Sequence, residues 1–217
     1  MTEIKIQIGK KAYASGIQQI VDLSVQTLPW RIYQLTLHHQ EAERALFDLP
    51  ERKQQQGRLV SLRPGNFMTN MYYSSDIIQT EDMFMEELDP EERQEWVSPW
   101  DIGLVAARIL MDPVEKHGDV AYELIGDVIS PQQRATMFSD VLGRPIHYEQ
   151  VDSQVIYDMF IRLGFDHTFA FSVSTYSANN PTVSRGLKIL LGRQPESVKE
   201  WLKKNKHVFD GSSVKEN

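Results

Sequence analysis

This sequence predicts an α/β fold built on a mostly parallel sheet with crossover helices. Two observations lead to that prediction. Short apolar runs rich in β-branched residues alternate along the chain with longer segments of helical periodicity, and turn or capping residues stand between them. Strands that are separated by helices of this length usually pair in parallel, because the helix carries the chain back to the same edge of the sheet.

The first third of the chain supplies two predicted strands, with one helix before the first strand and one between the two. A helix over residues 4–15 ends near Gly16, which is expected to be its C-cap, and a β-branched strand follows at Ile20–Ser24. The segment LHHQEAERAL has its alanines and second leucine on one face and its charges on the other, as in a surface helix. The apolar run at Arg58–Leu62 then predicts a buried strand.

Further units of the same kind follow. EWVSPWDIGLVAARIL predicts a brief extended stretch and then an apolar helix at Asp101–Leu110, with Asp101 as its N-cap. A short strand is expected at Tyr122–Ile125, a capped helix at Pro131–Leu142, and a last strand at Ile146–Gln150 after a Gly-Arg-Pro stop.

The acidic segment EDMFMEELDPEERQE, residues Glu81–Glu95, alternates methionine and Phe84 with carboxylates. We expect it to form an exposed amphipathic helix over the sheet, since such charge runs are usually solvated. The alternative is a mobile flap over a substrate pocket, because a polar loop precedes it directly.

Composition excludes several classes of function. The net charge of -7 and the absence of clustered Lys and Arg argue against a nucleic-acid partner. The chain has no cysteine, so disulfides, thiolate catalysis and zinc-thiolate sites are excluded. No apolar run approaches the ~18 residues that a membrane span requires, and the start lacks the apolar core of a signal peptide. We therefore expect a cytoplasmic protein with no membrane partner.

The segment LVSLRPGNFMTN is the strongest indication of a site. A buried strand stops at Arg63, Pro64 and Gly65 and delivers Asn66, Phe67 and Asn70 into a loop. Ligands of open α/β sheets bind just outside the carboxyl ends of the strands, which is where these residues would lie. The alternatives are a plain Pro-Gly turn, an Arg63 that pairs with carboxylates, and a Phe67 that packs in the core.

The succession GIQQIVDLSV, HHQEAERAL, LRPGNFMTN, WVSPWDIGLVAARIL and LIGDVISPQQRATMFSDVLGRPI resembles the NmrA-like family of atypical short-chain dehydrogenase/reductase proteins. The resemblance spans about residues 5–209 and holds in order and spacing. It implies a Rossmann-type domain that binds NADP(H) or NAD(H), a smaller substrate-side region, and hydride transfer to a small organic substrate. Other members are cofactor-sensing regulators.

This sequence departs from the family in one respect. Members begin with a G-x-x-G-x-x-G turn that lets the pyrophosphate approach a helix N-terminus, and no such turn is present here. The resemblance therefore implies a truncated chain that lacks the first half of the nucleotide-binding domain, so that NADP or NAD would bind weakly. We expect residues 1–130 to form the remainder of that domain, residues 131–210 a C-terminal substrate-side region interleaved with it in one globular unit, and residues 211–217 a disordered tail. A shortened gene, a genuine short paralogue and a fragment completed by another chain all remain open.

Candidate catalytic residues come from the same resemblance. The Tyr-x-x-x-Lys pair of classical short-chain dehydrogenases has no convincing counterpart on the expected helix. His39-x-x-x-Glu43 matches a pattern of several NmrA-like members, and residues four apart share a helix face, so that Glu43 would orient the imidazole. A helix-terminal histidine satisfied by backbone and water is the alternative. Ser24 resembles the serine that ends a strand near the nicotinamide, although a turn serine would look identical.

Binding roles are predicted for two further groups of residues. The cofactor is expected to meet residues at the exit of the second strand, namely Pro64, Gly65, Asn66 and Phe67. Substrate is expected to meet Asn70, Phe165 and Phe169, the last two from an aromatic stripe that would otherwise belong to the core. The remaining histidines are too scattered to form a metal site.

We therefore expect an NAD(P)(H)-dependent oxidoreductase that acts on a small organic molecule. The alternatives are a non-catalytic NAD(P)-sensing or protein-binding regulator, and an inactive fragment. If the first half of the domain is missing, the strand at Ile20–Ser24 would be left at an exposed sheet edge. A homodimer through that edge is the expected protein partner.

Overall fold

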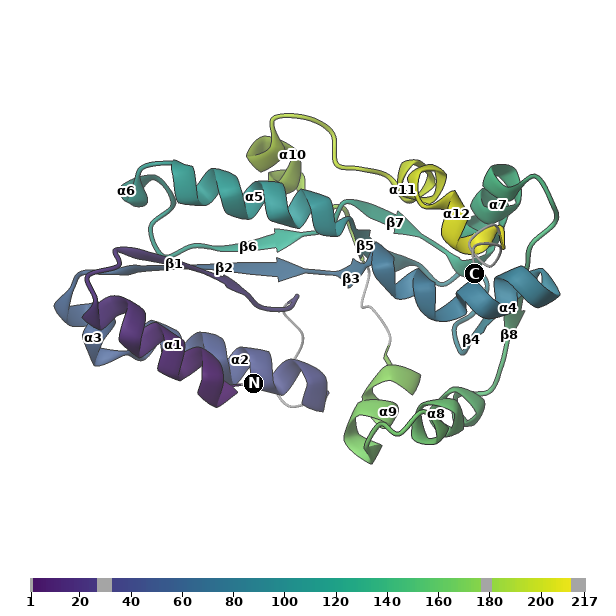
Figure 1. The fold of residues 1–217 in the computed structure, drawn as a ribbon, viewed down its shortest axis with the longest axis horizontal. Coiled ribbons are helices and arrows are strands. Elements are labelled where there is room, and N and C mark those ends of the chain that lie inside the picture. The colour runs from purple at the N-terminus through teal and green to yellow at the C-terminus, as the bar shows by residue number, and fades with distance from the viewer. Residues whose placement is uncertain (1, 27–32, 177–180, 212–217) are drawn as a thin grey trace, which may run out of the picture. The chain divides into compact units, whose positions relative to one another are not determined.

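The computed structural model describes residues 2–26, 33–176 and 181–211, and in the helix at 34–48 it leaves the first two side chains undescribed. The chain divides into two compact units that are interleaved along the sequence (Figure 1). Unit 1 comprises Met1–Gly65, Trp100–Leu124 and Ser184–Gln194, and unit 2 comprises Asn66–Pro99, Ile125–Val183 and Pro195–Asn217.

Unit 1 contains a three-stranded parallel sheet in the order β1-β2-β6. Its strands are β1 (Gln19–Leu23), β2 (Arg58–Pro64) and β6 (Ala121–Leu124). These are three of the strands expected from the sequence, and their parallel pairing is confirmed. Within the described ranges β1 pairs only with β2, so its other side is an open edge of the sheet.

Helices cover both faces of this sheet (Figure 1). The helices α1 (Thr2–Ala14), α2 (Gln34–Asp48) and α3 (Pro50–Gln54) lie on one face, and α5 (Pro99–Met111) and α10 (Arg185–Leu191) lie on the other. The short helix α6 (Val114–His117) joins α5 to β6.

A small apolar core lies between α1, α2, α3 and the sheet. It contains Tyr13, Leu46, Leu49 and Leu59, with Ile20 packed against it. Gly9 lets α1 approach α2 closely, because a Cβ on Gly9 would lie 2.4 Å from a methyl group of Leu46. The Tyr13 hydroxyl donates to the carbonyl of Arg58 at 2.8 Å and so ties α1 to the start of β2.

The helix expected at residues 101–110 is present, but Asp101 is not its N-cap. The helix α5 begins two residues earlier at Pro99, a residue whose fixed φ suits the first turn of a helix. Asp101 lies inside the first turn, is fully buried, and pairs with Arg193 at 2.5 Å. A distant cation therefore explains this aspartate, which corrects the prediction.

Unit 2 contains two small sheets. The strands β3 (Asn66–Phe67), β5 (Gln94–Val97) and β7 (Asp127–Ile129) form the first, in which β5 is parallel to β3 and antiparallel to β7. The strands β4 (Met83–Glu86) and β8 (His147–Gln150) form a parallel pair. Among the described residues the strands thus pair mostly in parallel, with one antiparallel pairing.

The prediction of a helix or flap at Glu81–Glu95 is wrong. The segment contains β4 and the first half of β5, and Phe84 is 1% exposed. Met83 to Glu86 pair in register with His147 to Gln150, so a partner more than sixty residues away converts the alternating pattern into a strand. Phe84 points into the core, where its ring lies against Phe138 and Tyr148.

The helices of unit 2 pack into two separate apolar clusters, the main core and a smaller cluster. These helices are η1 (Met68–Ser74, a 3-10 helix), α4 (Ser75–Glu81), α7 (Pro131–Leu142), α8 (Ser153–Arg162), α9 (His167–Ser174), α11 (Val198–Lys204) and α12 (Lys206–Phe209). The expected bounds of α7 are confirmed: Ser130 forms a capping box with Gln133, and Gly143 ends the helix with a φ of 76°.

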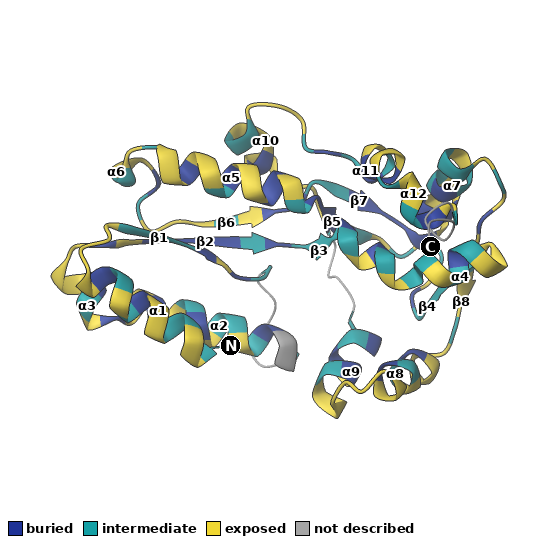
Figure 2. Ribbon diagram, in the orientation of Figure 1, coloured by how far each residue is buried: buried dark blue, intermediate teal, exposed yellow. Residues whose placement is uncertain are grey.

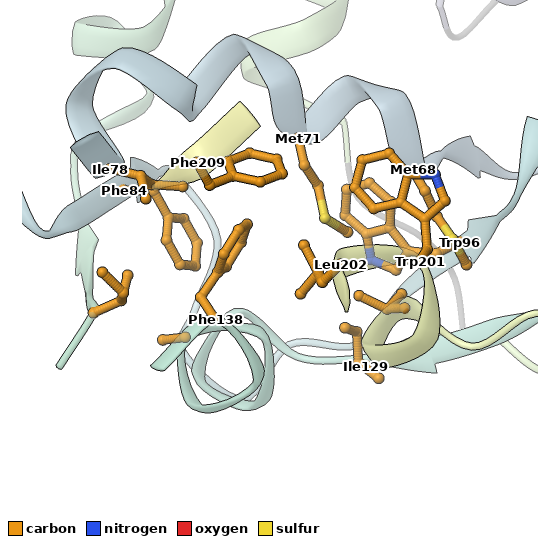
Figure 3. Close-up of a cluster of buried hydrophobic side chains, with 13 residues drawn as sticks. Met68, Met71, Ile78, Phe84, Trp96, Ile129, Phe138, Trp201, Leu202 and Phe209 are labelled. Carbon is orange, nitrogen blue, oxygen red and sulfur yellow. The ribbon is translucent and has the colours of Figure 1, made fainter. Parts of the chain in front are cut away.

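Aromatic and sulfur-containing side chains fill the core of unit 2 (Figure 3). Phe138 and Phe209 meet edge to face at 5.0 Å, and Trp201 lies near both Tyr72 and Phe209. Figure 2 colours the buried residues of this core and all other buried residues dark blue. Of the predicted tail at residues 211–217, all but Gly211 lies outside the described residues.

Candidate functional site

The carboxyl end of β1 holds a small polar cluster made by α1, α2 and the strand. Lys5 from α1 pairs with Asp22 of β1 at 2.7 Å and also donates to the carbonyl of Leu23 at 2.6 Å. Asp22 is 6% exposed, and its second carboxylate oxygen has no hydrogen-bond partner among the described residues. We call Lys5, Asp22 and His39 the β1 cluster.

His39 brings an imidazole to this cluster from the first half of α2. Burial is the main cause that lowers its pKa below the ordinary value of 6.5, and the nearby Lys5 cation lowers it further. The buried Nδ1 atom has no hydrogen-bond partner in the described structure. A neutral imidazole with an unpartnered nitrogen can accept a proton there.

Glu43 lies one turn after His39, but no hydrogen bond joins the two. Its carboxylate instead receives the Arg63 guanidinium through two hydrogen bonds, one from Nε at 3.2 Å and a shorter one from Nη2. Arg63 therefore takes the carboxylate that was expected to orient the imidazole. Glu43 acts on His39 only through its charge, which raises the pKa slightly against the larger effects of burial and Lys5.

Ser24 lies directly after β1 and is buried. Its backbone continues the parallel ladder, because its N–H donates to the carbonyl of Leu62 at 2.8 Å. The side chain lines a cavity together with Glu43 and Arg63, and His39 is not among the residues that line it. The structure thus brings Ser24 and Glu43 together, and places His39 with Lys5 and Asp22.

Pro64 and Gly65 close unit 1 at the end of β2. The Pro64 carbonyl accepts from the N–H of Gln26, and the N–H of Gly65 donates to the carbonyl of Leu124 at 3.2 Å. These backbone groups are therefore used within the sheet. Their predicted role in cofactor binding stays a prediction.

Three of the predicted site residues, Asn66, Phe67 and Asn70, belong to unit 2. Asn66 and Phe67 form β3 and pair with Trp96 and Val97 of β5, and both side chains are half-buried. Asn70 lies in η1 and is exposed. Nothing in their contacts identifies a ligand, so their binding roles remain predictions.

Phe165 and Phe169 belong to an aromatic cluster of α8 and α9. Their rings stack with centroids 4.5 Å apart, and Phe160 meets each of them edge to face. Ile156 and Ala170 complete this buried cluster. Packing of α8 against α9 accounts for both phenylalanines, and their predicted substrate contacts stay untested.

Two groups of chemical interest escaped the sequence reasoning. One is the Lys5–Asp22 pair, for which a single acidic residue inside an apolar strand was the available signal. The other is Glu95 of β5, which is fully buried and accepts a short hydrogen bond from the Tyr176 hydroxyl. Burial raises the pKa of Glu95, and its second oxygen has no partner among the described residues.

Within the described part of the chain, no group of three His, Asp or Glu side chains is arranged to hold a metal ion. The same part contains no helix that is long and apolar enough to cross a membrane.

Comparison with known proteins identifies the fold. No protein-family model and no curated protein matches the chain. Among solved structures, an NADPH-dependent quinone oxidoreductase from Escherichia coli is 18% identical, with a TM-score of 0.75 over 93% of this chain and 72% of its own. A nucleoside-diphosphate-sugar epimerase from Staphylococcus aureus is 16% identical, with a TM-score of 0.74 over 91% and 69%.

NmrA itself, a negative transcriptional regulator crystallised in complex with NAD, is also similar. It is 16% identical, with a TM-score of 0.70 over 97% of this chain and 72% of its own. The chain has the fold of the NmrA-like proteins and their NAD(P)-dependent relatives. The resemblance expected from the sequence is thus confirmed at the level of the fold, while identities this low leave substrate and activity open.

Proposed function

We propose that this chain is an NmrA-like protein that serves an NAD(P)(H)-dependent oxidoreductase reaction on a small organic substrate. The observation that carries the proposal is the β1 cluster at the carboxyl end of a parallel strand, where α/β sheets bind their ligands. His39 has a lowered pKa and an unpartnered Nδ1 there. The solved structures with this fold include an NADPH-dependent quinone oxidoreductase and a triphenylmethane reductase crystallised with NADP(H).

His39 would move the proton in such a reaction. Because burial and Lys5 favour the neutral imidazole, His39 can accept the proton of a substrate hydroxyl, and the imidazolium that forms can return this proton to a substrate oxygen. Lys5 holds Asp22 in place through the 2.7 Å ion pair, and the free oxygen of Asp22 can accept a hydrogen bond from a substrate hydroxyl.

The described residues do not fit the pyrophosphate of a dinucleotide. That group needs bare backbone at the start of a helix, which glycines provide. Neighbouring side chains instead occupy the space beside Gly9 and Gly57, since a Cβ on Gly57 would lie 2.5 Å from the Tyr13 ring. Gly16 forms a turn with a φ of 85°. We therefore expect this chain alone to bind NADPH weakly.

Substitution of His39 tests the proposal. Purified chain is supplied with excess NADPH and a simple quinone such as menadione, and reduction of the quinone is followed. We expect His39→Gln to reduce the rate by about 100-fold or more, as removal of a general acid or base does. The matched control is His38→Gln, which changes the exposed neighbour and should leave the rate within about twofold.

An NMR titration of the imidazoles gives a second readout. The proposal requires a His39 pKa below 6.5 that rises when Lys5 is replaced by Met, because the substitution removes a neighbouring cation. A His39→Gln chain that keeps full activity, or a His39 pKa above 6.5, would contradict the proposed role.

A non-catalytic, NAD(P)-sensing regulator is the second candidate. Two observations favour it. Glu43 accepts hydrogen bonds from Arg63, so it does not orient His39 through a hydrogen bond. A regulator that was crystallised with NAD has the same fold. In that case NADPH would shift the melting temperature of the chain, while no quinone or dye would be reduced at any substrate concentration.

A further inference from the structure

A cavity of about 380 Å³ lies in unit 1, and the proposed function makes no use of it. It is bordered by one face of α2, by β2, and by the segments that follow β1 and precede β6. We call it the α2 groove; its lining includes Ser24, Arg44, Phe47, Ser61, Arg63 and Val120.

Two buried hydroxyl groups open into the α2 groove. Ser24 is 5% exposed and Ser61 is 3% exposed, and neither hydroxyl has a hydrogen bond to any described residue. The parallel register places Ser61 opposite Asp22, so Ser24 and Ser61 lie on the same face of the sheet, one step apart on neighbouring strands. Each hydroxyl can therefore donate a hydrogen bond to a ligand oxygen in the groove.

The groove also carries one uncompensated positive charge. Arg63 is neutralised by Glu43, and Asp119 at the far end pairs with Arg52 at 2.7 Å and with Arg58. Arg44 is exposed and forms no ion pair with a described residue. An anion that entered the groove would therefore meet two hydroxyl donors and a free guanidinium.

One wall of the groove is apolar. Phe47 and Val120 line it, and both are exposed, at 45% and 42%. The Arg52 guanidinium lies 4.3 Å from the centroid of the Phe47 ring, which holds the ring in place. A ligand with an apolar body would cover side chains that are otherwise left in water.

We propose that the α2 groove binds a small organic carboxylate. Arg44 and the hydroxyls of Ser24 and Ser61 hold its two oxygens, and its apolar body lies against Phe47 and Val120. A single guanidinium balances one negative charge, which suits a carboxylate better than a phosphate dianion. The cavity has the volume of a small-ligand site, and the proposal concerns a site separate from the β1 cluster.

Titration calorimetry with benzoate tests this site. We expect saturable binding of one benzoate per chain, weakened by about 10-fold or more in Arg44→Gln, where the charged hydrogen bonds are lost. Ser61→Ala should weaken binding by roughly 3- to 10-fold. The control Arg162→Gln, which changes an exposed arginine of α8 in unit 2, should bind as the unaltered chain does. Benzamide, which has the same shape without the charge, should bind at least about 10-fold more weakly than benzoate.

Several results would overturn the proposal. The first is that benzoate shows no saturable binding. The second is that Arg44→Gln binds benzoate with the same affinity as the unaltered chain. The third is that inorganic phosphate binds as tightly as benzoate. Because Arg44 is exposed, its substitution does not depend on repacking the interior, so a folded variant is available even if Ser61→Ala is unstable. Unchanged benzoate binding in His39→Gln separates this site from the β1 cluster, so either proposal can fail without the other.

Discussion

The sheet face of unit 1 under α1 and α2, and the main core of unit 2, are both covered by helices but bury different kinds of side chain. The core of unit 2 is a continuous set of 13 apolar residues that includes Phe84, Phe138 and Trp201. The unit 1 face has a cluster of four, and beside it lie the buried polar residues Asp22, Ser24 and Ser61.

This difference separates stability from binding. Interlocked aromatic rings contribute stability because they remove a large apolar area from water. Buried oxygens without partners do the opposite, and a folded chain keeps them where a ligand or reactant can satisfy them. The aromatic packing is thus concentrated in the core of unit 2, and the candidate chemistry lies on this face of the unit 1 sheet.

Truncation of a core phenylalanine should have the largest effect. We expect Phe84→Ala to lower the free energy of unfolding by roughly 3 to 5 kcal/mol, because it removes a buried ring and leaves a cavity. Phe47→Ala in unit 1 removes a ring that is about half exposed and should cost about 1 kcal/mol or less. Urea denaturation measures the free energy of unfolding of both variants. Similar decreases in the two would contradict the proposed difference between the units.

A carboxyl group of unit 2, that of Glu87, should make the stability of the chain depend on pH. Burial raises the pKa of Glu87 to about 7, from an ordinary 4.5, so the folded state holds the proton more tightly than the unfolded state does. Stability should then be lost as pH rises from about 4.5 through 7 and stay constant above. Glu87→Gln should remove this dependence and be more stable by about 1 to 2 kcal/mol at pH 8, a figure reduced for partial solvent screening.

Urea unfolding at a series of pH values checks the Glu87 prediction. Glu91→Gln, a nearby exposed carboxylate, is the matched control and should retain the slope of the unaltered chain. A Glu87→Gln variant that still loses stability over this pH range would show that another group, such as Glu95, carries the effect.

The open edge of β1 gives the smallest expected effect. We propose that a second copy of the chain pairs with this edge, since β1 has a strand on only one side within the described ranges and Leu23 is 43% exposed. Lys5 covers only the carbonyl of Leu23. Light scattering should show weak dimers that form as concentration rises, and Leu23→Lys should abolish them. A monomer at every concentration would mean that the edge is protected.

Local patterns were sufficient to predict the longer elements of unit 1 and, in unit 2, α7 and β8. The β-branched run before Ser24, the apolar run before Pro64, and the cap at Ser130 with the stop at Gly143 each act within a few residues. Their strands and helix appear at the expected positions. Neighbouring residues determine such features through backbone propensity and capping, which the linear order of residues already contains.

The candidate site was less predictable, because its residues meet through the fold. Four-residue spacing predicted that His39 and Glu43 share a helix face, but it could not reveal that Arg63 from β2 binds the Glu43 carboxylate. The pairing of Lys5 with Asp22 likewise depends on how α1 packs on β1.

Only the tertiary structure determined which polar groups are buried and which strands find partners. Met83–Glu86 is a strand because β8 lies beside it, and Asp101 is buried because Arg193 reaches it. Ser24 and Ser61 are far apart in the sequence and become neighbours through the register of β1 on β2. The α/β class and the positions of the longer helices and strands of unit 1 were readable from the sequence, since these depend on local periodicity. Burial and charge pairing depend on contacts between distant segments, which no local pattern records.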